Sequence, residues 1–200
     1  RNEKGEEIPY QHVAGDKVIF PVNLQARGRA VYTVEAGQPA PVSAIACGRQ
    51  YPERLDDIAW ENDKSGYRVY GPALQQTGER AYGYDIMVKN VSTPVLEQRY
   101  AMELDATTRK QIADWRKAGE KAKADSLARA ISYHVDHGNG MDCYAVGPTL
   151  GGGTAALWTD SAIVYPYCYK EYEIVDNGPL RFTVRLTFPP VAVKDDTAVV

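Results

Sequence analysis

The stretch "EIVDNGPLRFTVRLTF", residues 173–188, decides the fold class because it contains a turn signal between two strand-like segments. Asn177-Gly178 is typical of a tight β-hairpin, since both residue types tolerate positive φ angles. After the turn, polar and apolar residues alternate in "RFTVRLTF" (181–188). This is the period of a strand with one solvated face, so the stretch predicts an antiparallel hairpin.

Similar segments, rich in β-branched and aromatic residues, occur along the rest of the chain. Glycine, proline and small polar residues separate them, as expected for strands joined by turns. The predicted strands are "KVIFPVNL" (17–24), "RAVYTVEA" (29–36), "GYRVYG" (66–71), "YDIMVKNV" (84–91), "VLEQRYAMEL" (95–104), "ISYHVD" (131–136), "AALW" (155–158) and "AIVYPYCYKEYEIV" (162–175).

One segment, residues 105–129, has a different composition and predicts helix. It is rich in Ala, Lys, Arg and Glu, and its apolar residues are sparse. Thr108 followed by Gln111 fits a capping box, and Gly119 is a natural break between two short helices. Acidic residues interleave with the basic ones, which favours a solvated helix face over a nucleic-acid patch.

Together these patterns predict a mainly β fold, an antiparallel β-sandwich with one helical insertion near 105–129. A chain of 200 residues suits one domain, so residues 1–200 are predicted to form a single sandwich domain or its N-terminal part. The chain begins at Arg1 and ends on "DDTAVV" (195–200), which resembles an interrupted strand. We therefore expect a fragment of a longer β domain.

The overall composition disfavours several classes of protein. A net charge of −3 gives no general attraction to nucleic acid, and no apolar run approaches the roughly 20 residues that cross a bilayer. Three cysteines without CxxC spacing favour separate thiols over a zinc site or a disulfide framework. Fourteen tyrosines against three phenylalanines suit a surface that binds sugars, although edge strands also use tyrosine.

Polar side chains and glycines concentrate in "SYHVDHGNGMDCYAVGPTLGGG" (132–153), which predicts a functional site. His134 and Asp136 would share one face of the predicted strand, and His137 would open the glycine-rich turn. An aspartate beside a histidine orients the imidazole as a general base or a metal ligand. We predict His134 or His137 as the proton acceptor and Asp136 as its partner. The competing interpretation is that the histidines only cap a turn.

A second polar stretch, "IAWENDKSGYRVYGPAL" (58–74), joins an aromatic residue to two acids and an amide. Amides and carboxylates hydrogen-bond sugar hydroxyls and an indole stacks on a pyranose ring, so Trp60 and Asn62 are candidate sugar-binding residues. Glu61 and Asp63 are candidate catalytic acids, given a raised pKa. The competing interpretation is a polar turn in which Asn62 and Asp63 cap the chain reversal and Trp60 anchors the core.

Arg68 and Tyr70 follow on one face of the predicted strand 66–71 and are further candidates for substrate binding. If the sugar is a uronic acid, the Arg68 guanidinium would neutralise its carboxylate. Asp85 in the next strand is also an expected partner for Arg68.

No cofactor is expected, but two weaker alternatives involve a divalent metal. His134, Asp136 and His137 form one candidate ligand set, although no ligand from a third segment is evident. Glu61 and Asp63, with a backbone carbonyl, form a candidate calcium site.

The two polar stretches resemble the most distinctive motifs of a family catalogued as domain of unknown function 4861, which occurs in secreted or periplasmic proteins of polysaccharide-degrading bacteria. "EIPYQ" (7–11), "KVIFPV" (17–22) and the segment 28–37 resemble its opening strands. The family in turn resembles galactose-mutarotase-like β-supersandwich proteins, many of which act on or bind carbohydrates. The residues at its motif positions are Trp60, Glu61, Asn62, Asp63, Arg68, His134, Asp136, His137, Asp142 and Tyr144.

The resemblance and the two stretches predict a secreted or periplasmic protein that acts on or binds oligosaccharides or polysaccharides, including those with uronic acids. As an enzyme it would be a lyase, a hydrolase or an epimerase, with Asp142 and Tyr144 among its substrate-binding residues. The alternative is a non-catalytic carbohydrate-binding or structural module of a polysaccharide-utilisation system. Carbohydrate is the expected partner, nucleic acid is not, and the oligomeric state stays open. The enzymatic prediction requires both stretches to line one cleft.

Overall fold

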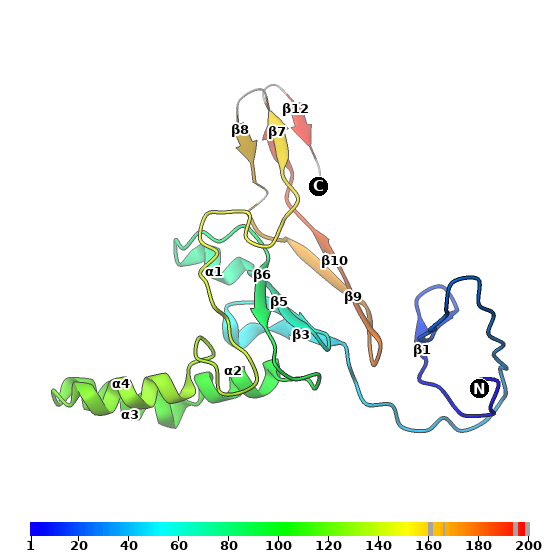
Figure 1. Ribbon diagram of the computed structural model, residues 1–200. Helices are drawn as coiled ribbons and strands as arrows, with labels where there is room; N and C mark the ends of the chain where they lie inside the picture. The colour runs from blue at the N-terminus through cyan, green and yellow to red at the C-terminus, as the bar shows by residue number, and fades with distance from the viewer. Residues whose placement is uncertain (160–161, 166, 194–195, 199–200) are drawn as a thin grey trace.

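The centre of the protein is an antiparallel sheet of four strands (Figure 1). The computed structural model describes residues 1–159, 162–165, 167–193 and 196–198. The sheet has the strand order β3 (Cys47–Tyr51), β4 (Asp57–Glu61), β5 (Ser65–Val69) and β6 (Asp85–Val88). Each strand pairs with the next one along the chain. β6 lies within the predicted strand 84–91, and β5 overlaps the predicted strand 66–71.

The other strands of the described residues form two-stranded antiparallel sheets. They are β1 (Gln11–Val13) with β2 (Lys17–Ile19), β7 (Leu157–Thr159) with β8 (Ala162–Val164), β9 (Glu171–Gly178) with β10 (Arg181–Thr187), and β11 (Val191–Val193) with β12 (Asp196–Ala198). The helices are η1 (Pro52–Arg54), α1 (Pro72–Gln76), α2 (Leu96–Leu104), α3 (Ala106–Lys117) and α4 (Lys121–Ile131).

The pleat of the central sheet gives it two faces, each with its own apolar cluster. Ile58 and Val69 point to one face and pack with residues of and around the β9–β10 hairpin. Ala59 and Met87 point to the other face and pack with α2. The sheet therefore lies between a β-hairpin and a helix. The prediction of a mainly β, antiparallel and sandwich-like fold with a helical segment is confirmed.

The predicted β-hairpin at 173–188 is confirmed, but its turn lies beyond the Asn-Gly pair. Gly178 pairs with Arg181, so the two residues between them form the loop. Asn177 stays in β9 because its side chain is bound to β3. Its Oδ1 accepts from the amide of Gly48 at 3.2 Å, and its Nδ2 donates to the Gly48 carbonyl at 2.9 Å.

Residues 95–104, predicted as a strand, form the helix α2 instead. The buried residues Leu96, Arg99 and Tyr100 recur at intervals of three and four, which places them on one helical face. The amide of Leu96 donates to the carboxylate of Glu61 in β4 at 2.9 Å. A side chain far away in the sequence therefore fixes the start of this helix.

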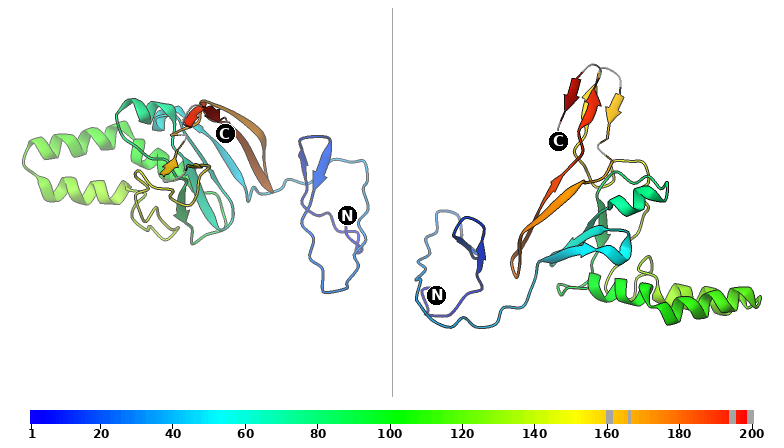
Figure 2. Two further views of the ribbon diagram at one scale, coloured as in Figure 1. Left: turned by 90° about the horizontal axis from the view of Figure 1, so that it is seen from above. Right: turned by 180° about the vertical axis from the view of Figure 1, so that it is seen from behind.

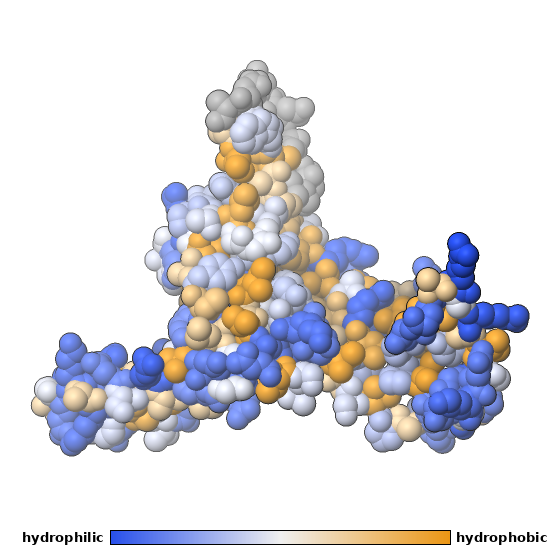
Figure 3. Space-filling view, viewed as in Figure 1, coloured by the Kyte–Doolittle hydropathy of each residue, from blue (hydrophilic) through white to orange (hydrophobic). Residues whose placement is uncertain are grey.

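The predicted helical insertion consists of α3 and α4, which lie side by side and project from the body as a helical arm (Figures 1 and 2). The break between them is at Gly119, where φ is +78°, as the sequence indicated. The far end of the arm is largely hydrophilic (Figure 3). The buried residues of its two helices are Ile112 and Ala124, which agrees with the predicted solvated face.

Both boundaries of the arm differ from the sequence prediction. Asp105 caps α3 by accepting from the amide of Thr108 at 2.7 Å, in place of the predicted capping box. The helix α4 continues to Ile131, and a turn follows it. The predicted strand 131–136 is therefore wrong.

Residues 1–46 contain one short hairpin, β1–β2, and otherwise lie in loops. The predicted strand 17–24 ends at Ile19, shortly before Pro21, which lacks the amide donor that a strand needs. The predicted strand 29–36 is not formed. This N-terminal segment lies beside the turn of the β9–β10 hairpin (Figure 2).

Residues 160–161, 166, 194–195 and 199–200 lie outside the described residues. They include one position of the predicted strand 162–175 and much of the terminal "DDTAVV".

Candidate functional site

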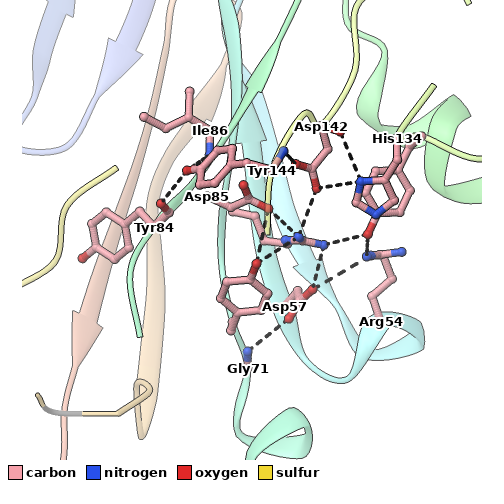
Figure 4. A network of polar contacts seen from close by, with 12 residues as sticks. Arg54, Asp57, Gly71, Tyr84, Asp85, Ile86, His134, Asp142 and Tyr144 are labelled. Atoms are coloured by element: carbon pink, nitrogen blue, oxygen red, sulfur yellow. Dashed lines mark hydrogen bonds and ion pairs between the residues drawn. The ribbon is translucent and has the colours of Figure 1, made fainter. Parts of the chain in front are cut away.

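A cluster of buried charged side chains lies on the α2 face of the central sheet, around Arg68 of β5. Asp85 is directly opposite Arg68 in β6, and its carboxylate pairs with the guanidinium, which confirms the pair expected from the sequence (Figure 4). Asp142 and Asp57 approach the same guanidinium at 3.4 Å and 3.8 Å. Because Arg68 is only 5% exposed, these pairs form away from solvent.

Two tyrosine hydroxyls extend the cluster. Tyr70 accepts from Nη2 of Arg68 at 3.1 Å and donates to Asp85 at 3.4 Å. Tyr133 accepts from Nη1 of Arg68 at 3.2 Å and from Nη2 of Arg54 at 3.0 Å. A buried charge is stable only when it is paired and hydrogen-bonded, so this network holds its members in one arrangement.

Burial changes the ionisation of the acids in the cluster. Loss of hydration raises the pKa of the Asp57 carboxyl to about 6, although Arg68 and Arg54 lie nearby. Burial, and then repulsion by the charge of Asp85, raises the pKa of Asp142. The cluster therefore takes up a proton in mildly acidic solution more readily than exposed aspartates do.

His134 is a member of the cluster that reaches solvent. Its side chain is 51% exposed, whereas that of Asp142 is buried. Nδ1 lies 3.1 Å from the main-chain carbonyl oxygen of Asp142 and 3.6 Å from its carboxylate Oδ2. A carbonyl oxygen only accepts, so Nδ1 carries the hydrogen and the lone pair of a neutral ring is on Nε2. The Tyr133 ring, centred 4.2 Å away, lies against the imidazole.

The glycine-rich segment 139–153 positions these residues by following the edge strand β6. The amide of Val88 donates to the Met141 carbonyl at 2.9 Å, and the amide of Tyr84 donates to the Gly153 carbonyl at 2.8 Å. At Gly140, where φ is +92°, a Cβ atom would collide with the Val88 carbonyl oxygen. The glycines therefore allow backbone to pack on backbone, and no ligand is needed to explain them.

Tyr144 fastens the same segment to β6. Its hydroxyl accepts from the amide of Ile86 at 3.2 Å and donates to the carbonyl of Tyr84 at 3.4 Å (Figure 4). Its own amide lies 3.5 Å from Oδ1 of Asp142. The Tyr144 side chain stays partly exposed, so it lies at the solvent boundary of the cluster.

Asp136 does not orient a histidine, contrary to the prediction. Its Oδ1 accepts from the amides of Gly138 and Gly140 at 2.8 Å and 2.9 Å, and its Oδ2 accepts from Asn90 at 2.9 Å. These bonds lower the pKa of Asp136 and shape the turn. The histidine partner is Asp142, because the strand that would have aligned Asp136 with His134 is not formed.

His137 follows the turn-capping interpretation. Its Nε2 lies 3.0 Å from the carbonyl oxygen of Ser132, and the residue is exposed. No contact joins it to the cluster of Arg68 among the interactions of the described residues.

Glu61 has a structural environment in place of the predicted catalytic one. The residue is 3% exposed. Its two carboxylate oxygens accept from the amides of Val95 and Leu96, each at 2.9 Å, and Oε2 accepts from the buried ammonium of Lys89 at 2.7 Å. The carboxylate therefore caps α2 and pairs with Lys89, and it does not face a cleft with His134.

The neighbours of Glu61 match the turn interpretation. Asn62 Oδ1 accepts from the amides of Lys64 and Ser65 at 2.8 Å and 2.9 Å and closes the β4–β5 turn. Asp63 pairs with the adjacent Lys64, at 3.1 Å, at the surface. Trp60 points to the opposite face of the sheet from Arg68 and stacks with Phe182, so it anchors the core.

The two predicted stretches therefore do converge, but through different residues from those expected. The residues that meet are Arg68 and Tyr70 from the first stretch, and His134, Asp142 and Tyr144 from the second. The candidates that lie elsewhere are Trp60, Glu61, Asn62, Asp63, Asp136 and His137.

Sequence reasoning missed Asp57 and Arg54 as members of the cluster. Asp57 accepts from the amide of Gly71 at 3.1 Å and lies 3.9 Å from Nε of Arg54. A usable signal was the alternation in "DIAWE" (57–61), which places Asp57 and Ala59 on one face of the sheet. Ala59 pairs with Arg68 across β4 and β5, so that face is the face of the cluster.

The candidate metal ligands do not come together in the structure. Among the described residues, no group of three His, Cys, Asp or Glu side chains is arranged to hold a metal ion. The Glu61 carboxylate is bound to Lys89 and α2, which does not fit the calcium alternative. The three cysteines, Cys47, Cys143 and Cys168, are free thiols, as the sequence favoured.

The fold and the site together define an antiparallel β protein whose central sheet carries a buried arginine–carboxylate cluster beneath an exposed histidine. The chain belongs to the family described as Domain of unknown function (DUF4861), whose model matches residues 1–200. It is similar to "Uncharacterized protein P7" of Formosa agariphila, with 26% identity over 181 residues, or 89% of this chain. The chain spans 42% of that relative's length. No solved structure matches it.

Helices long and apolar enough to cross a membrane are not found within the part of the chain that the structure describes.

Proposed function

We propose that this chain is a periplasmic or secreted carbohydrate-active protein that acts on oligosaccharides or polysaccharides by proton transfer at His134. The observation that carries the proposal is the half-exposed imidazole whose Nδ1 is fixed by the buried residue Asp142. A ring held in this way offers Nε2 to a bound substrate as a base and, once protonated, as an acid.

Asp142, Arg68 and Asp85 act as positioning residues behind the imidazole. Oδ2 of Asp142 lies between Nδ1 of His134 at 3.6 Å and Nη2 of Arg68 at 3.4 Å. The carboxylate stabilises the positive charge that forms when Nε2 takes a proton, while Arg68 and its partner Asp85 hold the carboxylate in place. Because Arg68 is buried, it does not reach a substrate carboxylate, in contrast to its predicted role.

The carbohydrate part of the proposal is supported by the family's resemblance to sugar-binding β-supersandwich proteins and by a tyrosine at the site. Tyr144 is 37% exposed and is linked to Asp142, and the exposed part of its ring offers a sugar a stacking face, while its hydroxyl is bound to β6. Hydrolysis usually needs two carboxyl groups that flank the bond. Asp57, Asp85 and Asp142 are all buried, so a lyase or epimerase reaction suits the site better.

The test uses the full-length protein on a panel of plant and algal glycans, with reducing ends, unsaturated-sugar absorbance and, for epimerisation, sugar configuration by NMR as readouts. His134→Gln is expected to lower turnover by about 100-fold or more, the usual contribution of a general base. His137→Gln is the matched control, because that histidine contacts only the turn. Both histidines are exposed, so neither change should shift the melting temperature by more than about 2 °C. Equal turnover in the two variants would reject the assignment.

The non-catalytic alternative rests on a separate observation. Within the cluster, Arg68, Asp85 and Asp142 are all buried, and His134 and Tyr144 are the partly exposed members named above. Such a cluster also suits a scaffold that presents a binding surface. Glycan binding without any turnover in the same panel supports this alternative.

A further inference from the structure

We propose that a groove between the helical arm, the end of α2 and Arg54 of η1 binds the negatively charged group, a carboxylate or a sulfate ester, of an acidic saccharide. The saccharide part of this inference rests on the proposed function. The groove has a volume of about 510 Å³ and is lined by Arg54 and by residues of α2, α3, α4 and the turn after α4. Arg54 belongs both to the groove and to the candidate functional site. The other two arginines of the groove, Arg109 and Arg116, are not part of that site.

Arg54 and Tyr133 both line the groove and contact each other. Nη1 of Arg54 donates to Glu103 at 2.8 Å, and Nη2 donates to the hydroxyl of Tyr133 at 3.0 Å. Its Nε is buried and makes no hydrogen bond within the described residues. The Arg54 side chain is 11% exposed, so water screens its charge poorly, while Glu103 and Asp57, 3.9 Å from its Nε, offset part of that charge.

One wall of the groove is a face of α3 that carries Arg109 and Arg116. The two residues are seven positions apart, or two helical turns, so they share one side of the helix, with Ile112 between them. Both are exposed, and neither forms an ion pair with any described residue. Three of the residues that line the groove are therefore arginines, and one, Glu103, is an acid.

This distribution of charge favours an anion with several acceptor oxygens. A guanidinium group matches carboxylate and sulfate oxygens with paired hydrogen bonds, and a concave site concentrates the potential of its charges. The chain as a whole has a net charge of −3, so the groove is a local exception to the overall charge. The acid of α3, Asp114, is bound to Lys110 and is not among the residues that line the groove, so the arginines of this helix face are not balanced by an acid of the same helix.

The position of the groove connects it to the candidate site. Ser132 and Tyr133 line its end, and His134 is the next residue along the chain. Tyr133 also touches both centres, since its hydroxyl accepts from Arg54 and from Arg68 at 3.0 Å and 3.2 Å. A saccharide whose acidic group is held in the groove would place a neighbouring sugar ring toward His134.

The test measures binding to the full-length protein by calorimetry at low and high salt. The probes are trigalacturonate, a sulfated κ-carrageenan tetrasaccharide, neutral galactotriose and a short single-stranded DNA. The variant Arg109→Gln/Arg116→Gln is compared with Lys117→Gln/Lys121→Gln, which removes the same charge from the arm outside the groove. All four positions are exposed, so both double variants should fold.

We expect at least one acidic saccharide to bind, with affinity about tenfold weaker in the arginine double variant and within about twofold of wild type in the lysine double variant. High salt should weaken this binding, and galactotriose should bind poorly. Equal binding by the two double variants, equal binding of galactotriose or DNA, or binding of neither acidic saccharide would overturn the inference. His134→Gln should bind the acidic saccharide normally. Normal turnover in that variant would therefore reject the proposed function while leaving the groove assignment intact.

Discussion

Asp57 shows how burial sets the ionisation of a side chain in this protein. Two arginines lie near its carboxylate, at 3.8 Å and 3.9 Å, yet the pKa of the group rises to about 6 because its hydration is lost. The distances are too long for direct hydrogen bonds, so the ion pairs only partly offset the loss of water. The carboxyl group of Asp57 therefore binds a proton more tightly in the folded state than in the unfolded chain.

This shift predicts the direction of a pH effect on stability. The folded pKa, about 6, is above the ordinary value of 3.8, so protonation of Asp57 stabilises the fold below that range. The stabilisation is lost as the pH rises through 6, and it amounts to on the order of 3 kcal/mol. Asp57→Asn keeps an acceptor for the Gly71 amide and removes the titration.

The measurement is the free energy of unfolding in urea at pH 4, 5, 6 and 7, for wild type and Asp57→Asn. Between pH 4 and 7, the difference between the two proteins should change in favour of the variant. Acids with lowered pKa values, such as Asp176 and Glu97, produce the opposite slope in both proteins and cancel in this difference. Parallel curves for the two proteins would contradict the prediction.

At the residue scale, the sequence identified polar side chains of the kinds found in functional sites. It did not identify the partners that they contact. Glu61 and Asp136 were predicted to take part in catalysis, because an acid beside an indole or a histidine often does. In the structure, both carboxylates accept hydrogen bonds from main-chain amides. A carboxylate serves an amide as well as a substrate, and only the three-dimensional neighbours distinguish the two uses.

At the scale of elements, the segment 139–153 covers the edge of β6 by close backbone contact. Gly138 and Gly140 have almost the same φ, +90° and +92°. They differ in their surroundings, because a Cβ at Gly138 would meet nothing within 4 Å, whereas one at Gly140 would meet the backbone of Val88. This pair therefore separates conformational cost from steric cost.

Gly138→Ala should destabilise the fold by about 1–2 kcal/mol, the cost of positive φ for alanine. Gly140→Ala should lose at least about 2 kcal/mol more, since the Val88–Met141 hydrogen bond must shift to admit the methyl group. Urea unfolding measures both. Equal losses would mean that the segment is not held against β6.

The elements that were predicted best are those with local signals. The strands β5 and β6 and the β9–β10 hairpin show alternation or turn residues within their own sequence. The helix α2 was missed because its start depends on Glu61, 35 residues before Leu96. The start of α3 was placed correctly to within a few residues, since its cap Asp105 is adjacent in sequence.

At the scale of the whole molecule, the N-terminal segment is held to the β9–β10 hairpin by few residues. Oε1 of Gln11 accepts from the amides of Leu180 and Arg181 at 2.9 Å and 2.7 Å, and Nε2 donates to the Arg181 carbonyl at 2.9 Å. Asp176 accepts from the amide of Ala14 at 2.8 Å. Gln11 is 6% exposed, so these bonds are shielded from water.

Gln11→Ala should weaken this attachment by about 2 kcal/mol, or roughly 30-fold in the population of the detached state. Hydrogen exchange at β1 should then become faster, while the central sheet keeps its protection. Gln25→Ala is the control, because Gln25 is exposed and its side chain makes none of these contacts. Unchanged exchange at β1 would contradict the prediction.

The convergence of the two polar stretches belongs to this scale, and the sequence predicted it only in part. Arg68 and Asp142 are 74 positions apart, and the strand register that sets Arg68 opposite Asp85 decides which side chains can meet. The residues of each stretch were enough to predict that it is polar and contributes to a site. The pairing between stretches depended on α2 and on the path of segment 139–153, neither of which was evident locally.

The buried cluster also determines what a protein engineer would have to transplant. Its carboxylates come from β4, β6 and the segment after α4, and its guanidinium groups come from β5 and η1. Grafting residues 132–144 into a foreign scaffold would carry over the imidazole but leave behind the charges that hold its partner. To transfer the cluster, a designer would have to transfer all four strands of the central sheet together with the segment after α4. The cluster therefore depends on the whole fold and cannot be moved as a single loop.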